Sequence, residues 1–398
     1  MAVRSTAMEH VLFAVTPPGL EDIAAAELRA LGVARTEVAP GGVEFRGTPS
    51  DLYRANLELR TAGRILLRLG SFGAKRFETL RRRAAALPWE RFFARGDALA
   101  LRVTCRKSRL YHSGAVAERL AEAIALRLGW SPARVRVAGD AQDPELEVAA
   151  QPAGARVQLV LARIERDLCA LSVDASGEPL HRRGYRQATG KAPLRETLAA
   201  ALLLASGWDA ASPLVDPFCG SGSIAIEAAL LARLRAPGRA RRFAFEAWRD
   251  FEAALWARLL AASDARSAAA PPPPAIAASD RDAGAVAATR ANAARAGVAG
   301  DLDISQRALS ALVSPPGVGW VVTNPPHGVR LSRGRDLRDL YARLGQVLRT
   351  RFGGWHVALL SSEPRLLAAA GLPLEPVLRL RHGGLRLQLV RGRVPERT

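Results

Sequence analysis

Apolar positions in the first 175 residues alternate or recur at helical spacing over short stretches, which predicts a mixture of strands and helices. The alternating stretches predict strands at 11–15, 43–45, 99–103, 157–161 and 169–173. Helical spacing predicts helices at 19–31 and 116–128, and a further helix-then-strand piece at 51–70. The last two strands lie close together in sequence and predict a hairpin that ends this α+β region.

After residue 193 the pattern changes to helices that alternate with short, continuously apolar strands. The expected helices are 194–206, 222–234, 282–296 and 336–349, and the expected strands are a short one near 215, 275–279, 302–305, 318–323 and 355–360. This order predicts a mostly parallel sheet that is covered by helices on both faces. Alternation on both sides of Gly383-Gly384 predicts a terminal antiparallel hairpin.

An Ala- and Pro-rich tract at 268–275 interrupts this pattern and includes four consecutive prolines. Proline lacks a backbone N–H and is excluded from helix interiors and central strands, so we expect a surface insertion here.

The chain of 398 residues carries 57 Lys and Arg against 38 Asp and Glu, a formal charge of +19. Such a surplus favours a polyanionic partner, although an Arg-biased, GC-rich genome is an alternative source of it. Cys105, Cys169 and Cys219 are scattered and form no C-x-x-C pair, so we expect no disulfide framework and no metal. Because no apolar run approaches the length of a membrane span or a signal-peptide core, the expected location is the cytoplasm.

A glycine-containing loop follows the short strand near residue 215 and opens a helix. It carries Asp216, Phe218, Gly220 and Gly222, and its glycines let the backbone approach a ligand at the carboxyl edge of the sheet. Plain turns also use glycine. The loop lacks both the G-K-[ST] ending of a phosphate-binding loop and the third glycine of the dinucleotide fingerprint, so S-adenosylmethionine is favoured over ATP or NAD.

The next strand ends at Asp280, where a carboxylate is well placed to hold the two hydroxyls of a ribose. Asp280 could instead cap the following helix, but Asp282 is the better candidate for that cap.

Asn324-Pro325-Pro326-His327 follows another predicted strand, which the sheet would bring beside the glycine loop. An exocyclic amine of a base is a poor nucleophile, and it gains from acceptors that bind its protons while its lone pair faces a methyl donor. The Asn324 side-chain oxygen and the Pro325 carbonyl are such acceptors. In this scheme the base leaves its stack and lies against the flat ring of His327; the alternative is a tight turn without chemistry.

These residues resemble the THUMP-containing class I RNA methyltransferases, most closely the bacterial 23S rRNA guanine-N2 methyltransferases. The segments that carry the resemblance are 16–21, 56–62, 88–90, 107–112, 181–186, 192–200, 216–223 and 324–328. The resemblance implies an α/β protein with a Rossmann-like class I methyltransferase sheet and an N-terminal ferredoxin-like and THUMP region. The implied parts are a ferredoxin-like unit at 1–60, a THUMP RNA-binding domain at 61–175, a basic linker at 176–192 and a methyltransferase domain at 193–392.

By the same resemblance, the enzyme transfers a methyl group from S-adenosylmethionine to N2 of a guanine in 23S rRNA. We expect a direct transfer without a covalent enzyme intermediate, and we expect the protein to be a monomer. Arg195 and Thr197 match the family segment that passes over the cofactor. The family has Tyr or Phe at the position of His327, and it tends to place an Asp for the adenine amino group where this chain has Arg307.

Cations and aromatic side chains gather in two polar segments, a loop at 106–112 and the linker at 181–186, and suggest RNA contacts. The candidate RNA-binding residues are Arg106, Lys107, Arg109, Tyr111, Arg182, Arg183, Tyr185 and Arg186. A tRNA substrate, adenine-N6 methylation of DNA and a catalytically inactive RNA-binding relative remain alternatives.

Overall fold

The computed structural model describes residues 9–138, 147–148, 155–187, 194–327, 337–382 and 384–396. The chain forms two compact units. Unit 1 comprises the described residues of Met1–Thr16, Ala24–Leu180 and Arg241–Leu260, and unit 2 comprises those of Pro17–Ile23, His181–Ala240 and Ala261–Thr398.

Unit 1 is built on one mixed sheet with the strand order β2-β3-β1-β4-β10-β9-β5-β6. Its strands are β1 (His10–Val15), β2 (Thr36–Ala39), β3 (Gly42–Gly47), β4 (Arg64–Gly73), β5 (Ala98–Arg106), β6 (Ala133–Val135), β9 (Val157–Glu165) and β10 (Leu168–Asp174). The predicted hairpin is confirmed, because β9 and β10 pair antiparallel from Leu168 opposite Glu165 onward. A separate two-stranded ladder joins β7 (Val137–Ala138) to β8 (Glu147–Val148).

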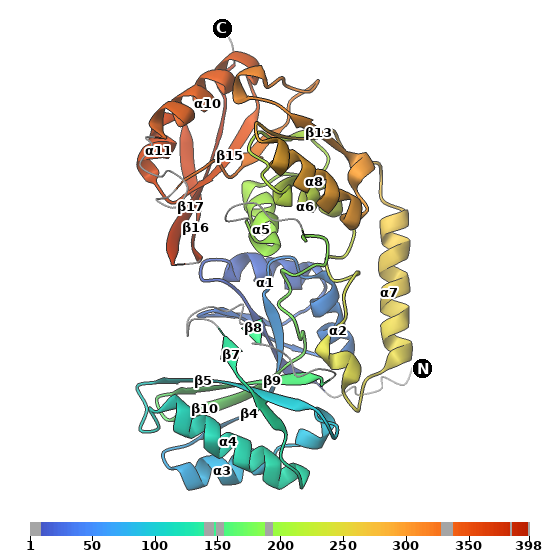
Figure 1. Cartoon of the computed structure of the whole chain (residues 1–398), viewed down its shortest axis with the longest axis vertical. Coiled ribbons are helices and arrows are strands. Elements are labelled where there is room, and N and C mark those ends of the chain that lie inside the picture. The colour runs from blue at the N-terminus through green and yellow to red at the C-terminus, as the bar shows by residue number, and fades with distance from the viewer. Residues whose placement is uncertain are drawn as a thin grey trace. The chain divides into compact units, whose positions relative to one another are not determined.

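The helices of this part of the chain are α1 (Glu21–Ala30), α2 (Pro49–Glu58), α3 (Phe77–Ala85) and α4 (Ser113–Leu128), with a short 3-10 turn at Trp89–Arg91. Figure 1 shows α3 and α4 side by side along the strands β5, β9 and β10. The expected division after residue 60 falls within this unit, because β4 pairs with β1 on one edge and with β10 on the other. The two parts that the resemblance implies on either side of residue 60 therefore share one sheet.

Unit 2 contains a seven-stranded sheet in the order β13-β12-β11-β14-β15-β17-β16. Its strands are β11 (Leu214–Asp216), β12 (Ile276–Asp280), β13 (Leu302–Gln306), β14 (Trp320–Thr323), β15 (His356–Ser361), β16 (Leu374–His382) and β17 (Leu385–Arg393). The first five are parallel, and β17 runs antiparallel to both β15 and β16. The parallel sheet and the terminal hairpin agree with the prediction; Gly383 lies outside the described residues.

Helices cover both faces of this sheet (Figure 1). They are α5 (Glu196–Ser206), α6 (Ser223–Ala232), α8 (Ala283–Ala296), α10 (Arg338–Arg351) and α11 (Pro364–Ala369). Two apolar cores result, because α5, α6 and α8 pack on one face whereas α10 and α11 pack on the other. Single 3-10 turns lie at Ala299–Asp301 and Leu309–Ala311.

The segment between α6 and β12 is much more than the short surface tract that the prolines predict. It contains a 3-10 turn at Ala244–Ala247 and the sixteen-residue helix α7 (Ala253–Ala268). Only the residues after α7, up to β12, form the expected connection without helix or strand. Residues 241–260 belong to unit 1, although the chain before and after them belongs to unit 2; we call them the aromatic segment, for Phe243, Phe245, Trp248, Phe251 and Trp256.

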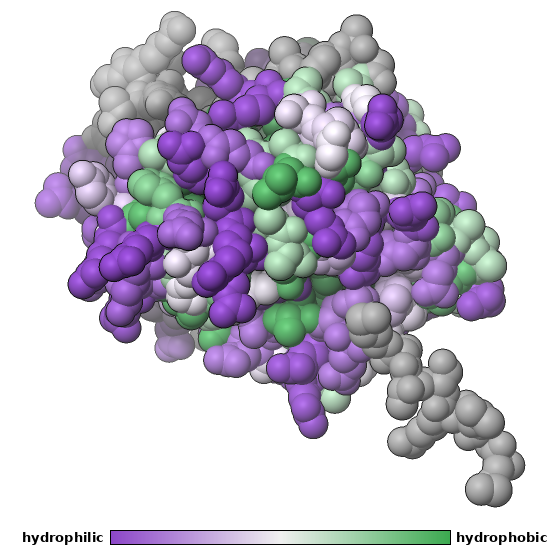
Figure 2. Space-filling model, turned by 90° about the horizontal axis from the view of Figure 1, so that it is seen from below, coloured by the Kyte–Doolittle hydropathy of each residue, from purple (hydrophilic) through white to green (hydrophobic). Residues whose placement is uncertain are grey.

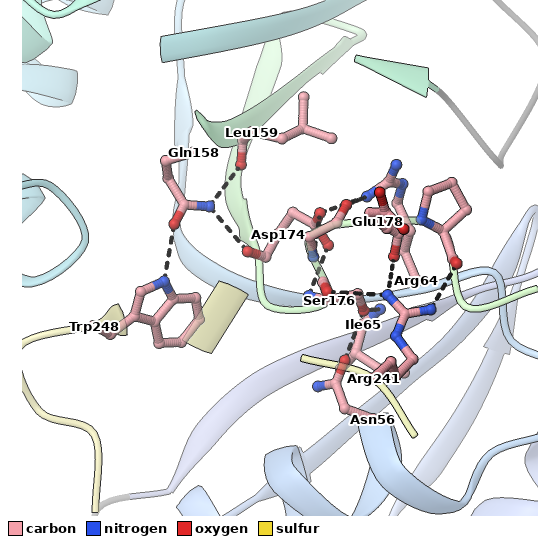
Figure 3. A network of polar contacts seen from close by, with 12 residues as sticks. Asn56, Arg64, Ile65, Gln158, Leu159, Asp174, Ser176, Glu178, Arg241 and Trp248 are labelled. Carbon is pink, nitrogen blue, oxygen red and sulfur yellow. Dashed lines mark hydrogen bonds and ion pairs between the residues drawn. The ribbon is translucent and has the colours of Figure 1, made fainter. Parts of the chain in front are cut away.

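A buried polar network holds the aromatic segment in unit 1 (Figure 3). The Trp248 indole N–H donates to Oε1 of Gln158 at 2.9 Å, and the Gln158 amide donates to the Asp174 carbonyl at 2.9 Å. The Asp174 carboxylate in turn forms a fully buried ion pair with Arg64. Arg241 donates to the Pro179 carbonyl at 2.7 Å. Trp248 is thus tied to β9 through Gln158, and Arg241 to the residues that follow β10.

Candidate active site

The glycine loop joins β11 to α6 in a conformation that requires glycine. Gly220 and Gly222 have φ values of +55° and +86°, a region that other L-residues rarely adopt. A Cβ atom on Gly222 would lie 2.7 Å from Cγ2 of Thr289. The close packing of loop against helix therefore excludes larger residues at position 222.

The helix α8 holds this loop in place with two polar side chains. Thr289 donates through Oγ1 to the Gly220 carbonyl at 2.8 Å, and Asn292 donates through Nδ2 to the Ser221 carbonyl at 2.9 Å. The N–H of Cys219 donates to the Ser279 carbonyl at 3.0 Å, which joins the loop to the end of β12. Hydrogen bonds to α8 and to the end of β12 thus hold the glycine loop in place.

Asp280 lies at the end of β12 against the loop. Its Oδ2 accepts from the Gly220 N–H at 3.1 Å and its Oδ1 accepts from the Asp282 N–H at 3.0 Å. Asp282 caps α8, since its Oδ1 accepts from the Ala285 N–H at 2.9 Å. The prediction that Asp282 rather than Asp280 is the cap is confirmed, and the Asp280 carboxylate keeps lone pairs for further donors.

Asp216 ends β11 and is buried beside the neighbouring strand β14. Thr323 donates through Oγ1 to Asp216 Oδ1 at 2.5 Å, and the Phe218 N–H donates to the same oxygen at 3.2 Å. Asp216 Oδ2 is buried without a hydrogen-bond partner. Burial raises the pKa of Asp216 to about 7, and these two hydrogen bonds offset only part of that effect.

Asn324 follows β14 directly, one residue beyond the partner of Asp216. Its Oδ1 atom is also buried without a hydrogen-bond partner. A buried amide oxygen without a donor is rare and costs about 1–3 kcal/mol of desolvation, which calls for an explanation such as a ligand. Two orphaned acceptors therefore lie at the ends of adjacent parallel strands.

The ring of His327 is held by its own loop. Nδ1 lies 2.9 Å from the Pro325 carbonyl, which can only accept, so this nitrogen carries the hydrogen and Nε2 of the neutral ring keeps a free lone pair. Burial lowers the pKa of His327, whereas Pro325 and the nearby Glu363 act in the opposite direction. Tyr341 is buried on α10 and donates to the Pro326 carbonyl at 3.4 Å, which ties the Asn324-Pro325-Pro326-His327 loop to α10.

Over residues 183–381, half of the chain, the sequence matches the family described as RMKL-like, methyltransferase domain. The chain belongs to this family. Residues 11–66 also match the RlmL ferredoxin-like domain, and both matches agree with the fold class expected from the resemblance.

Relatives of this RMKL-like chain extend over almost its full length. The Ribosomal RNA large subunit methyltransferase K/L of Syntrophotalea carbinolica is 36% identical over 394 residues, which are 96% of this chain and 53% of that relative. The chain thus spans about half the length of this curated relative.

Two solved structures are similar over both units. A methyltransferase crystallised with SAH (S-adenosylhomocysteine), designated SMU.472, is 27% identical with a TM-score of 0.82 and covers 98% of this chain and 99% of its own. A protein of Listeria monocytogenes described as an N6-adenine-specific DNA methylase is 30% identical with a TM-score of 0.81 and covers 96% of each chain.

The two residues expected to pass over the cofactor differ in exposure. Arg195 precedes α5 and is partly exposed, so it stays a candidate contact. Thr197 is buried, and its contact with a cofactor stays a prediction. Arg307 follows β13 and its N–H donates to the Asp280 carbonyl at 2.9 Å, so it lies at the same edge of the sheet.

The prediction of RNA contacts is wrong for three linker residues. Arg183 is buried and pairs with Glu227 at 2.7 Å, and the Tyr185 hydroxyl donates to the same carboxylate at 2.9 Å. Arg186 pairs with the buried Glu196 at 2.9 Å. These side chains face the core of unit 2, and only Arg182 of this group is exposed. Residues 188–192 of the predicted linker lie outside the described residues.

The loop at 106–112 does present its side chains outward. Its backbone is fixed, because Ser108 Oγ donates to the Arg106 carbonyl at 2.7 Å and the Arg109 N–H donates to Asp167 Oδ1 at 2.7 Å. The exposed fraction of Tyr111 is 81%, and Arg106, Lys107 and Arg109 are not buried either. The four predicted RNA-binding residues of this loop are therefore accessible.

The α3 and α4 side of unit 1 is mostly polar. Figure 2 views the molecule from below and shows hydrophilic side chains over much of this face, with apolar ones scattered among them. Arg81, Arg82 and Arg83 of α3 are exposed. No helix in the described part of the chain is long and apolar enough to cross a membrane.

Thr323, Thr289 and Asn292 are the site residues that the sequence did not reveal. Thr323 is the last residue of a predicted apolar strand, and the other two lie on a predicted helix with no motif around them. The only available signal was their i, i+3 spacing on the helix that follows Asp280, which places them on one face.

Proposed function

We propose that this protein transfers a methyl group from S-adenosylmethionine to the exocyclic N2 of a guanine in large-subunit ribosomal RNA. The observation that carries the proposal is the buried Oδ1 atom of Asn324, which has no partner and follows the strand next to Asp216. The name of the K/L relative supports ribosomal RNA as substrate, and the SAH in the SMU.472 crystal supports the cofactor. The proposed location is the cytoplasm.

The residues around the glycine loop fit S-adenosylmethionine by their chemistry. The free Oδ2 of Asp216 suits the ammonium of the methionine part, since a buried carboxylate gains from a cation. The Asp280 carboxylate suits the ribose hydroxyls, and Gly220 and Gly222 leave room for close backbone approach. Phe218 and Arg195 are further candidate contacts. When bound, S-adenosylmethionine supplies an electrophilic methyl group on a sulfonium.

Asn324 would accept a hydrogen bond from one proton of the target amine through Oδ1. The Pro325 carbonyl has a second lone pair beyond the one that His327 occupies, and it would accept from the other proton. Together these acceptors orient the amine and stabilise the positive charge that develops on its nitrogen during transfer. Pro325 and Pro326 restrict the backbone and keep both acceptors in place.

His327 would provide the flat surface against which the target base lies after leaving its stack. Because burial keeps the ring neutral, it adds no positive charge beside a cationic methyl donor. The accessible loop of Arg106, Lys107, Arg109 and Tyr111, together with Arg182, would bind the RNA backbone and unpaired bases.

The test is transfer of a tritiated methyl group from S-adenosylmethionine to undermodified ribosomal RNA, tRNA and DNA, followed by nucleoside analysis. We expect label in N2-methylguanosine of large-subunit RNA. Label in tRNA or in N6-methyladenine of DNA would replace the proposed substrate. RNA binding without label in any substrate would indicate a catalytically inactive relative.

A further inference from the structure

The linker segment at 181–186 lies in unit 2, and its alternate residues are buried. His181, Arg183 and Tyr185 face inward, whereas Arg182 and Gly184 face solvent. Burying an arginine and a tyrosine in this way is costly unless both find partners. The linker segment is therefore bound to unit 2 through buried side chains.

Glu227 of α6 is the partner of both Arg183 and Tyr185. Its carboxylate lies 2.7 Å from Nη1 of Arg183 and accepts from the Tyr185 hydroxyl at 2.9 Å. Burial and the neighbouring carboxylates raise the pKa of Tyr185 well above its ordinary value, so its hydroxyl stays a donor. Removing Arg183 or Glu227 would leave the other charge buried and unpaired. The hydrogen bond to Glu227 holds the Tyr185 side chain in place, and with it the Tyr185 backbone.

The Tyr185 backbone is connected to the glycine loop by two residues of α8. Arg295 donates through Nε to the Tyr185 carbonyl at 2.8 Å and through Nη2 to Oδ1 of Asn292. Asn292 then donates through Nδ2 to the Ser221 carbonyl at 2.9 Å. An unbroken series of hydrogen bonds thus runs from the linker to the loop proposed to hold the cofactor.

We infer that Arg295 and Asn292 are positioning residues that set the cofactor affinity of the glycine loop according to the position of the linker. This inference rests on the proposed cofactor site. Neither residue belongs to the proposed acceptor or cofactor contacts, and both act through the Ser221 carbonyl. Arg295 fixes the Asn292 amide so that its N–H group faces the loop, and the linker fixes Arg295. The linker is thereby coupled to the active site of unit 2.

Arg295→Met tests the inference because it removes the donors of an exposed side chain while keeping its aliphatic stem. The matched control is Arg290→Met, on the same helix, where an exposed arginine donates to the Ile304 carbonyl at 2.8 Å instead. We expect Arg295→Met to weaken S-adenosylmethionine binding about three- to tenfold in titration calorimetry, a range typical of mutations along a coupled network. KM for the cofactor should rise by the same factor, with kcat at saturating cofactor unchanged, and Arg290→Met should bind as the wild type does.

Asn292→Ala provides a second readout that general destabilisation would not mimic. If the two residues act in series, Arg295→Met should have almost no further effect on cofactor affinity once Asn292 is alanine. Equal affinities of the Arg295→Met and Arg290→Met proteins, or additive effects in the double variant, would overturn the inference. Asp216→Ala distinguishes a failure of the proposed cofactor site from a failure of this inference. Unchanged cofactor binding in that variant would show that the cofactor site itself is misplaced.

Discussion

Thr323 donates a hydrogen bond to Asp216 across two neighbouring parallel strands, at 2.5 Å between Oγ1 and Oδ1. Leu214 and Val215 of β11 pair with Trp320 and Val321 of β14, so the last residues of both strands meet at the carboxyl edge of the sheet. This contact joins the glycine loop to the Asn324 loop. It also leaves the second oxygen of Asp216 free for a cation.

The first prediction concerns the pH dependence of stability. Burial raises the pKa of Asp216 from 3.8 to about 7, so between these values the unfolded state ionises while the folded state holds its proton. The Asp216 contribution to stability is therefore complete below pH 3.8 and lost as pH rises towards 7. We expect Asp216→Asn to raise the melting temperature of the cofactor-free protein at pH 8 more than at pH 5. A difference from wild type that stays constant between these pH values would contradict the assignment.

Ionised Asp216 is also the form that suits an ammonium group. Cofactor affinity should therefore increase as pH rises through 7, and this increase should vanish in Asp216→Asn. Calorimetric titration of both proteins with S-adenosylmethionine between pH 6 and 8 measures the two slopes. Thr323→Val, which removes the hydrogen bond but keeps the carboxylate, should move the midpoint of the increase to higher pH.

Asn324 is expected to be essential for transfer but not for binding. Asn324→Ala removes the orphaned acceptor, and loss of one such group in an active site typically lowers kcat about 100- to 1000-fold. Single-turnover methylation with saturating RNA measures the rate, and calorimetry measures cofactor affinity separately. Turnover close to that of the wild type would eliminate Asn324 as acceptor of the target amine.

His327 should give the reaction an acid limb that a Tyr or Phe ring at this position would not. Its pKa lies below the ordinary 6.5 because the ring is buried, so protonation occurs only in acid and then places a second cation beside the sulfonium. We expect kcat at saturating cofactor to fall below pH 6.5 in the wild type, and His327→Phe to remove most of this fall while the ring still supports the base. The same acid limb in both proteins would assign it to another group.

The main features of unit 2 followed from the sequence because its strands and helices have regular local patterns and its two motifs directly follow strands. The aromatic segment did not, since Trp248 finds Gln158 only through the tertiary fold, 90 residues away in sequence. The prediction of RNA contacts in the linker was wrong for a related reason. Arg183 and Tyr185 look like RNA ligands by composition, and only the position of Glu227 shows that they point inward. Charge along a sequence does not reveal which side chains of such a segment are buried.

The accessible basic loop makes a separate prediction about RNA affinity. Each phosphate contact contributes about 0.7 to the slope of log affinity against log salt for single-stranded nucleic acid. Replacing Lys107 and Arg109 by Ala should therefore reduce this slope by up to about 1.4, whereas replacing Arg343, an exposed arginine of α10 bound to Gln346, should leave it unchanged. Filter binding at several salt concentrations measures the slope. An unchanged slope in the double variant would place the RNA elsewhere on the protein.

The aromatic segment should be a major source of stability for unit 1. Trp248 packs edge-on against Phe92 with ring centroids 4.9 Å apart, and Tyr53 stacks on Phe245 at 4.4 Å. Trp248→Ala would remove the packing on Phe92 and leave Gln158 Oε1 without its donor, a combination that costs about 3–5 kcal/mol for a buried aromatic residue. Arg242→Ala is the matched control, because that side chain of the same segment is 93% exposed. We expect protease digestion to cut within residues 241–260 in Trp248→Ala and not in the control. Equal resistance of both variants would mean that the segment is held by contacts other than those of Trp248.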